Sequence, residues 1–279
     1  MDQPVAVVTG GSSGIGESVC RALQGAGFTV YAAARRMDQM AGLAADGMTI
    51  VQVDVTDDRS LVALVDQVVA ETGRIDVLVN NAGYGSYGAL EDVPMDEARR
   101  QFDVNVFGLA RLTQLVLPHM RSRRSGRIVN ISSMGGKIYE PMGSWYHSTK
   151  FAVEGLSDSL RMELRPFGIQ VVVIEPGAIK TEWAGISADH VRARSAGGPY
   201  AKQAGQVGAV LDAGAGETAR GSDPSVVADA VVKAATARRP RTRYVIGLGA
   251  KPLIFIRRVL PDRGFDFVMR QIFRRADRG

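Results

Sequence analysis

The sequence contains almost no cysteine and no long apolar run. Cys20 is the single cysteine among 279 residues, so no internal disulfide can form and the fold does not depend on oxidation. No apolar stretch approaches the roughly 18 residues that a membrane-spanning helix needs. The N-terminus, MDQPVAVVTG, enters a strand pattern at once and lacks the basic and apolar regions of a signal peptide. These absences predict a soluble, cytoplasmic protein.

Histidine is also scarce, which limits the metal sites that the chain could build. The three histidines are His119, His147 and His190. His119 and His190 have no cysteine or carboxylate partners at ligand spacing, so we expect no metal site. His147 lies between Tyr146 and Lys150, and we interpret it as facing solvent and as incidental to the chemistry.

Basic and acidic side chains balance over most of the chain. Residues 1–250 carry 26 basic and 26 acidic side chains, so the net charge of +5 comes from the tail, residues 251–279. A neutral main body argues against a nucleic-acid partner.

The tail is amphipathic and broken by Pro261 and Gly264. It could cover a substrate pocket, form a subunit interface or lie on an anionic membrane surface. We favour packing over membrane contact, and we expect a homodimer or homotetramer.

What the chain does contain is an alternation of strand and helix patterns. Six β-branched apolar runs predict strands and read PVAVVTG, FTVYAAA, TIVQVDV, DVLVNNAG, GRIVNISS and IQVVVIEPG. We expect a seventh strand at RTRYVIG near Tyr244. Continuous apolar runs are typical of strands buried on both faces. Four segments between them show a 3.6-residue period: residues 15–26, 60–72, 96–120 and 145–167. The pattern predicts an α/β fold, a single-domain doubly wound (Rossmann-type) parallel sheet with helices on both faces, over residues 1–279.

The pattern weakens in one long stretch, residues 182–223. It contains eight glycines and little clear periodicity. A loop of that length in a compact domain is usually a functional lid or a partly disordered segment. We therefore expect a flexible lid over a substrate site.

A glycine-rich turn, TGGSSGIG, follows the first strand and opens the first helix. Its glycines are Gly10, Gly14 and Gly16. Glycines let the backbone approach a phosphate closely, and a helix N-terminus supplies free N–H groups to it. At the first strand–helix junction this turn predicts a dinucleotide site, although a plain connection would look similar.

The end of the second strand carries two cations where many dinucleotide sites place an acid. Ala34 is followed by Arg35 and Arg36. An acid there would bind the ribose 2′-hydroxyl, whereas two cations suit a 2′-phosphate. The sequence therefore favours NADP(H), with NAD(H) as the alternative.

A serine, a tyrosine and a lysine follow the fifth strand. Ser133 ends that strand at the carboxyl edge of the sheet, where ligands bind in open α/β folds. Tyr146 and Lys150 are four residues apart and share one face of the next helix. Alone, such a pair is usually a surface contact.

The ordered set of these motifs resembles the classical short-chain dehydrogenase/reductase family over residues 5–181. TGGSSGIG, NNAG (80–83), Asn105, Ser133 and YHSTK occur in the family's order. The resemblance implies that Tyr146 is the general acid or base, that Ser133 holds the substrate oxygen and that Lys150 bonds the nicotinamide ribose. It implies that Asn105 anchors a water in a proton relay to Lys150. The cofactor-binding set that follows is Gly10, Ser12, Ser13, Gly14, Ile15, Gly16, Arg35, Arg36, Asp54, Val55, Asn81, Ala82, Gly83, Tyr146, Lys150, Pro176, Gly177, Ile179 and Thr181.

The resemblance also implies that Lys150 lowers the pKa of Tyr146. Moving a phenol from a pKa of ~10 to ~7 takes about 4 kcal/mol of differential stabilisation. An exposed ion pair supplies less than that. We therefore expect a partly desolvated site in which the charge of the cofactor adds to that of Lys150.

The substrate is less well defined than the cofactor. Met134, Tyr139, Met142 and Trp183 are candidate wall residues, which suggests a lipophilic ketone, aldehyde or alcohol, although they could equally be loop packing. The expected activity is an NADP(H)-dependent oxidoreductase. The alternatives are an NAD-dependent alcohol dehydrogenase and a non-enzymatic dinucleotide sensor on the same fold.

Overall fold

The computed structural model describes residues 3–213 and 221–275. Seven parallel strands form one sheet in the order β3-β2-β1-β4-β5-β6-β7, as the sequence predicts. The strands are β1 (Val5–Thr9), β2 (Thr29–Ala34), β3 (Thr49–Gln52), β4 (Val77–Asn80), β5 (Gly126–Ile131), β6 (Ile169–Pro176) and β7 (Arg243–Ile246). The strand order reverses between β1 and β4, which places a ligand-binding crevice at their carboxyl ends.

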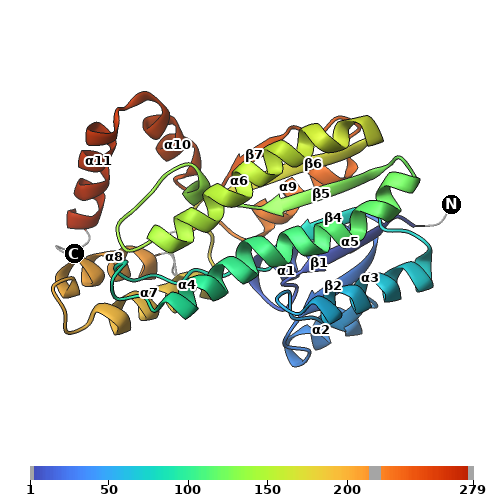
Figure 1. The fold of residues 1–279 in the computed structure, drawn as a ribbon, viewed down its shortest axis with the longest axis horizontal. Coiled ribbons are helices and arrows are strands. Elements are labelled where there is room, and N and C mark those ends of the chain that lie inside the picture. Colours follow the sequence, from blue (N-terminus) through green and yellow to red (C-terminus); the bar gives the residue numbers. More distant parts are fainter. Residues whose placement is uncertain (1–2, 214–220, 276–279) are drawn as a thin grey trace.

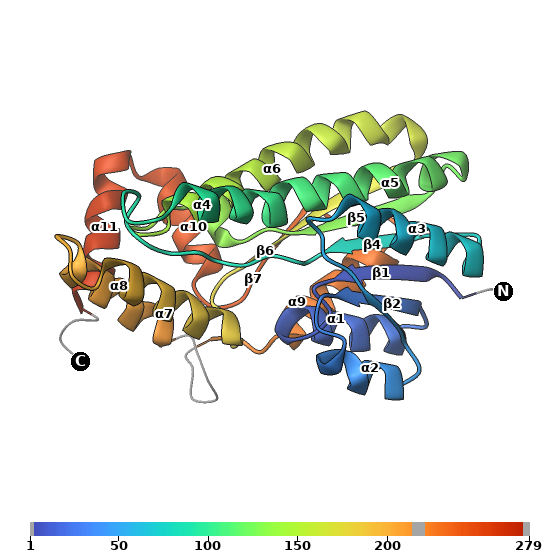
Figure 2. The same cartoon turned by 60° about the horizontal axis from the view of Figure 1, so that its bottom comes forward.

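Helices cover both faces of this sheet (Figures 1 and 2). One face packs against α3 (Asp58–Thr72), α5 (Leu109–Ser122) and α6 (Ser144–Leu164). The other packs against α1 (Gly14–Gly25), α2 (Ala41–Ala45) and α9 (Ser225–Thr236). Cys20 lies in the α1 core, where burial raises the pKa of its thiol to about 12. It is therefore an inert core residue.

Several further elements gather at the carboxyl edge of the sheet, on the left of Figure 1. They include the short η3 (Met134–Gly136), α7 (Glu182–Ser195) and α8 (Ala201–Asp212). The helix predicted over 96–120 is present as three successive segments: α4 (Met95–Phe102), the π-helical η2 (Asp103–Gly108) and α5.

The region predicted as a lid, residues 182–223, differs from the expectation of an irregular segment. Residues 182–195 and 201–212 are helical, and 214–220 lie outside the described residues. The buried face of α7 consists mainly of small or polar residues, Ala184, Ser187, Ala188, Val191 and Ser195. Their spacing is helical, but a pattern of large apolar residues cannot reveal such a face.

The basic tail packs on its own domain. It forms α10 (Ala250–Val259) and α11 (Asp262–Arg275), which are separated at Pro261, whereas Gly264 lies inside α11 and does not break it. Phe265, Met269 and Phe273 repeat at helical spacing and are buried in an apolar cluster at the carboxyl edge. No helix in residues 3–213 or 221–275 is long and apolar enough to cross a membrane.

Candidate active site

A cavity of about 750 Å³ opens at the carboxyl edge of the sheet. This volume lies within the usual range for ligand pockets. Every residue that the sequence assigns to the cofactor lines it, and so does Ser133. Residues from the β1–α1 turn, from the ends of β2, β4, β5 and β6, and from α7 and α8 share its wall. The predicted cofactor and catalytic groups therefore face one continuous space.

The glycine-rich turn has the geometry of a phosphate cradle. Gly10 and Gly14 have positive φ angles of 69° and 54°, which side-chain-bearing residues rarely adopt. A Cβ on Gly16 would lie 1.9 Å from the Gly10 carbonyl oxygen, so this position accepts only glycine. The Ser13 side chain makes no capping bond at the start of α1. The first N–H groups of α1 are therefore left for an anion, and this fits a dinucleotide pyrophosphate.

Asn81 fastens the end of β4 to this turn. Its Nδ2 donates to the carbonyl oxygens of Thr9 at 3.0 Å and Gly10 at 3.2 Å. The Thr9 Oγ1 accepts from the backbone N–H groups of Asn81 and Ala82, each at 3.1 Å. These bonds fix the floor of the cavity where the sheet order reverses.

Two exposed cations stand at the far end of the cavity. Arg35 and Arg36 follow β2, and neither forms an ion pair with another described residue. Asp54 lines the cavity nearby, and its Oδ1 accepts from the Thr56 N–H at 2.9 Å. Burial acts to raise the pKa of Asp54, but the Thr56 bonds and the charge of Arg35 together lower it. Asp54 is therefore ionised. The guanidinium groups of Arg35 and Arg36 form no ion pair with it, so they remain available to an anion.

Tyr146 and Lys150 lie in the first two turns of α6, buried against the cavity. Their exposed fractions are 7% and 8%. Lys150 Nζ donates to the Ile131 carbonyl oxygen at 3.0 Å and lies 6.0 Å from the centre of the Tyr146 ring. Ser133 starts η3, and its Oγ accepts from the Gly135 N–H at 3.0 Å. All three functional groups come from the end of β5 and the start of α6.

The pKa of Tyr146 departs from the expected direction. Burial raises it well above its usual range, against the opposing effect of Ser133, and Glu140 raises it further. Burial also lowers the pKa of Lys150 to about 8, although Glu154 acts to raise it. A desolvated pocket disfavours both charged forms. In the protein alone, the neighbouring Lys150 therefore does not bring the pKa of Tyr146 below its usual range.

Asn105 lies behind the cavity wall rather than in it. Its Nδ2 donates to the Tyr84 carbonyl oxygen at 2.9 Å and to Thr149 Oγ1 at 3.1 Å, and its Oδ1 accepts from the Tyr84 N–H. A Cβ on Gly83 would lie 3.1 Å from Asn105 Oδ1 and 3.8 Å from Lys150 Nζ. Asn105 and Lys150 thus meet at the same glycine, and the π-helical turn η2 holds the amide there.

The comparisons with known proteins agree with this geometry. Residues 4–191 match the short chain dehydrogenase family. This chain belongs to that family. An NADPH-dependent 3-dehydrocapnine reductase from Ornithobacterium rhinotracheale is 35% identical over 274 residues, 94% of each chain. A 3-ketodihydrosphingosine reductase from Bacteroides thetaiotaomicron is 40% identical over 181 residues, 65% of this chain and 66% of its own.

A solved structure extends the match to the whole chain. The crystal structure of a short-chain dehydrogenase from Streptomyces avermitilis is 33% identical and has a TM-score of 0.79. The match covers 100% of this chain and 99% of that one. The protein is therefore a NAD(P)-dependent oxidoreductase with the short-chain dehydrogenase fold.

Two of the four candidate wall residues of this short-chain dehydrogenase line the cavity. Met134 and Trp183 do so, whereas Tyr139 and Met142 do not. The Tyr139 hydroxyl donates to Asp266 at 2.9 Å and its ring packs against Phe265, so α11 draws it away from the site. Sequence reasoning missed further apolar groups of the wall, among them Ile138, Ile186, Val210 and Leu211. Most of these come from α7 and α8, whose helices were not predicted.

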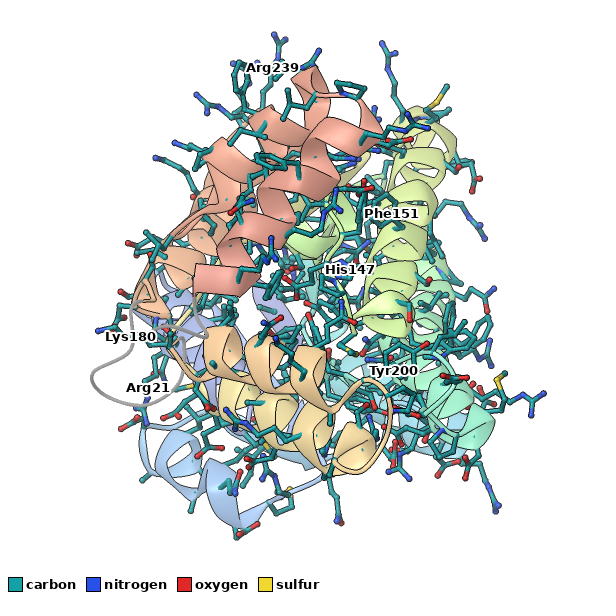
Figure 3. The ribbon with its side chains drawn as sticks, turned by 90° about the vertical axis from the view of Figure 1, so that its left-hand side faces the viewer. Arg21, His147, Phe151, Lys180, Tyr200 and Arg239 are labelled. Atoms are coloured by element: carbon teal, nitrogen blue, oxygen red, sulfur yellow. The ribbon has the colours of Figure 1, made fainter. Side chains whose placement is uncertain are left out.

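The expectation that His147 faces solvent is wrong. The residue is 6% exposed and lies in the interior at the centre of Figure 3, whereas Phe151, one turn further along α6, is 47% exposed. The His147 Nδ1 lies 2.8 Å from the Gly135 carbonyl oxygen, and the His147 Nε2 lies 3.8 Å from Glu140 Oε1. The loop between Ser133 and Tyr146 folds over the start of α6 and buries the ring. Helical spacing alone could not reveal this.

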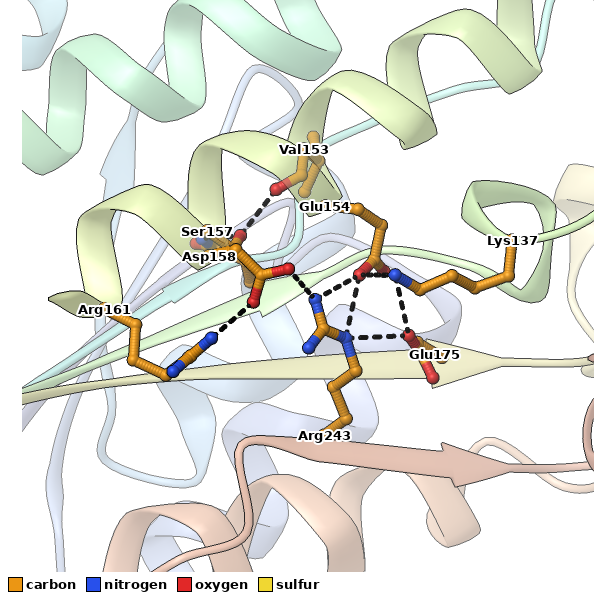
Figure 4. Close-up of polar contacts among 9 residues, drawn as sticks. Lys137, Val153, Glu154, Ser157, Asp158, Arg161, Glu175 and Arg243 are labelled. Carbon is orange, nitrogen blue, oxygen red and sulfur yellow. Dashed lines mark hydrogen bonds and ion pairs between the residues drawn. The ribbon is translucent and has the colours of Figure 1, made fainter.

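A second polar cluster lies beyond Lys150 on α6 (Figure 4). Glu154 Oε2 lies 2.9 Å from Lys137 Nζ and 3.0 Å from the guanidinium of Arg243. Arg243 also contacts Asp158 at 2.7 Å and Glu175 at 3.2 Å. Burial and the neighbouring Glu154 raise the pKa of Glu175 to about 7, although Lys137 and Arg243 oppose this. The cluster ties α6 to β6 and β7.

Proposed function

We propose that this protein uses NADPH to reduce a lipophilic ketone or aldehyde, with Tyr146 as the proton donor. Ser133 holds the carbonyl oxygen together with Tyr146, and Lys150 bonds the nicotinamide ribose. The cofactor supplies the hydride, and the phenol of Tyr146 gives the proton to the carbonyl oxygen, so the product is the alcohol. The observation that carries the proposal is that Ser133, Tyr146, Lys150 and the glycine-rich turn line one cavity.

The preference for NADPH rests on the two exposed cations at the end of β2. Arg35 and Arg36 form no ion pair at contact distance among the described residues, and the cavity reaches both. Guanidinium groups suit a phosphate, which NADPH carries on its ribose and NADH does not. The relative from Ornithobacterium rhinotracheale is named as NADPH-dependent, which supports the same choice.

The substrate class rests on the apolar wall around Tyr146. Trp183 packs its ring 5.2 Å from that of Tyr146, and Ile138, Ile186 and Leu211 line the same space. A mainly apolar wall favours a substrate with a hydrocarbon portion. The named relatives act on 3-ketodihydrosphingosine and 3-dehydrocapnine, and these names support a lipophilic ketone here.

Asn105 completes the proposal as the anchor of a water that passes protons to Lys150. Its amide contacts Tyr84 and Thr149, so the water would use the remaining lone pair of Oδ1 or the backbone carbonyl oxygen.

We also propose that the protein forms a homodimer or homotetramer. Phe107 and Phe151 are 60% and 47% exposed, and burying them would favour association. Light scattering of the purified protein tests this point.

The experiment on the cofactor compares NADPH with NADH in wild type and in Arg35→Ala. We expect the variant to weaken NADPH binding by about tenfold, roughly 1.4 kcal/mol, and to change NADH binding by less than twofold. Fluorescence titration measures both affinities. A wild type that binds the two cofactors equally would contradict the preference. A panel of ketones, aldehydes and alcohols followed by nicotinamide absorbance tests the reaction itself.

A further inference from the structure

The wall of the cavity beside Tyr146 contains a carboxylate that the proposed reduction does not use. Glu140 comes from the loop between η3 and α6, and its side chain is 15% exposed. Its Oε1 accepts from the Tyr87 hydroxyl at 2.7 Å and faces His147 Nε2 at 3.8 Å. The Tyr87 ring in turn lies 5.6 Å from the ring of Tyr146. The carboxylate is therefore close to the place where the carbonyl is reduced.

The carboxylate is ionised although it lies in the protein interior. Burial acts to raise the pKa of Glu140, but His147 and the bond from Tyr87 lower it below its usual value. The same contact with Glu140 raises the pKa of His147 against the effect of burial. A buried charge is costly unless it has partners. The carboxylate therefore keeps its charge with Tyr87 and His147 as its partners.

One oxygen of Glu140 is left for a ligand. Oε1 takes both contacts named above, and no residue in the described part of the chain donates to Oε2. Neither a lysine nor an arginine among the described residues lies within ion-pair distance of Glu140. The carboxyl-bearing side chain of Glu140 lines the cavity, so a ligand in the substrate space meets this residue.

Glu140 differs in this respect from Glu97, another carboxylate of the same wall. Glu97 Oε1 accepts from Ser86 Oγ at 2.6 Å and lies 3.3 Å from the guanidinium of Arg194. Glu97 therefore has a cationic partner of its own. Glu140 lies close to Tyr146 through Tyr87 and has no lysine or arginine partner among the described residues, so an ammonium group is a natural complement.

We propose that Glu140 binds an ammonium group of the substrate, so that the preferred substrate is an amino ketone with the amine a few bonds from the carbonyl. The inference rests on the proposed reductase function. His147, held by Gly135, and Tyr87 orient the carboxylate through contacts to its Oε1. The apolar wall of Trp183 and the α7–α8 side chains takes the hydrocarbon portion of the same molecule.

The test compares two ketones with the same alkyl chain, one of which carries an amino group beside the carbonyl. At pH 7 we expect wild type to favour the amino ketone at least tenfold in kcat/KM. In Glu140→Gln this ratio should fall to about one, since the amide keeps the size of the side chain and loses its charge. Glu163→Gln removes the same charge from an exposed position on α6 and should keep the wild-type ratio.

A second measurement does not depend on turnover. Calorimetry with the NADP-bound protein compares a long-chain alkylamine with the alcohol of the same length. We expect the amine to bind at least tenfold more tightly, and Glu140→Gln to remove that difference. A wild type that reduces ketones without favouring the amine, or a Glu140→Gln protein that keeps the preference, overturns the subsite. Amine binding that depends on Glu140, in a protein that reduces no carbonyl, supports the subsite and overturns the proposed reduction.

Discussion

Helix α6 carries two buried charged side chains one turn apart, and the protein satisfies them differently. Lys150 faces the cavity, has a carbonyl oxygen as its hydrogen-bond partner and has its pKa lowered to about 8 by burial. Glu154 faces β6 and β7 and contacts both Lys137 and Arg243 (Figure 4). The charge that is left unbalanced is the one at the reacting centre, and the balanced charges fix the helix that presents it.

The variant Lys150→Met tests whether Lys150 serves turnover rather than stability, and we expect it to have the largest effect. Turnover should fall at least ~10³-fold, because in the proposed mechanism Lys150 binds the nicotinamide ribose beside the proton donor. The free energy of unfolding should change by less than about 1 kcal/mol, since a buried cation without a carboxylate contributes little stability. Steady-state kinetics and urea unfolding measure the two effects. A large loss of stability would place Lys150 with the structural charges.

The second variant, Arg243→Met, should have the opposite profile. It leaves the buried Glu154 and Glu175 with Lys137 but without Arg243, so the free energy of unfolding should fall by up to about 3–5 kcal/mol. Activity per folded molecule should stay within a few-fold of wild type. Arg239→Met is the matched control, because Arg239 is exposed on the surface (Figure 3) and its loss should cost less than ~0.5 kcal/mol. Equal changes in the free energy of unfolding for the two variants would contradict a structural role of the cluster.

The smallest expected effect concerns the pH dependence of stability. The pKa of Glu175 is raised from 4.5 to about 7 in the folded protein, so its protonated form favours folding. That contribution is fully present below pH 4.5 and is lost as the pH rises through 7. Glu175→Gln should remove this loss, so the free energy of unfolding of the variant at pH 8 should exceed that of wild type by on the order of 1–3 kcal/mol. Thermal unfolding from pH 5 to pH 8 tests this, and parallel curves for the two proteins would contradict it.

Local patterns in the sequence account for most of the fold. Apolar runs predict the seven strands, and the glycine spacing predicts the turn, because Gly16 has no room for a side chain. The pairing of Glu154 with Arg243 joins positions 89 residues apart, and no local pattern encodes it. The helix α7 was missed because its buried face is built from alanine and serine.

The site was predictable only in part, for the same reason. Tyr146 and Lys150 share a helix, so their spacing alone places them on one face. Glu140, Tyr87 and His147 come together because a loop folds back over α6, and the interior position of His147 could not be read from its neighbours in the sequence. The pKa of Tyr146 likewise depends on burial, which the spacing of residues does not reveal.

The central claim is that Tyr146 gives the proton while other groups bind the cofactor. The most direct measurement compares Tyr146→Phe with wild type in two assays, nicotinamide absorbance with a ketone that wild type reduces and fluorescence titration with NADPH. We predict that turnover falls at least ~10³-fold while the NADPH dissociation constant changes by less than about threefold. A Tyr146→Phe protein that retains turnover would contradict the account.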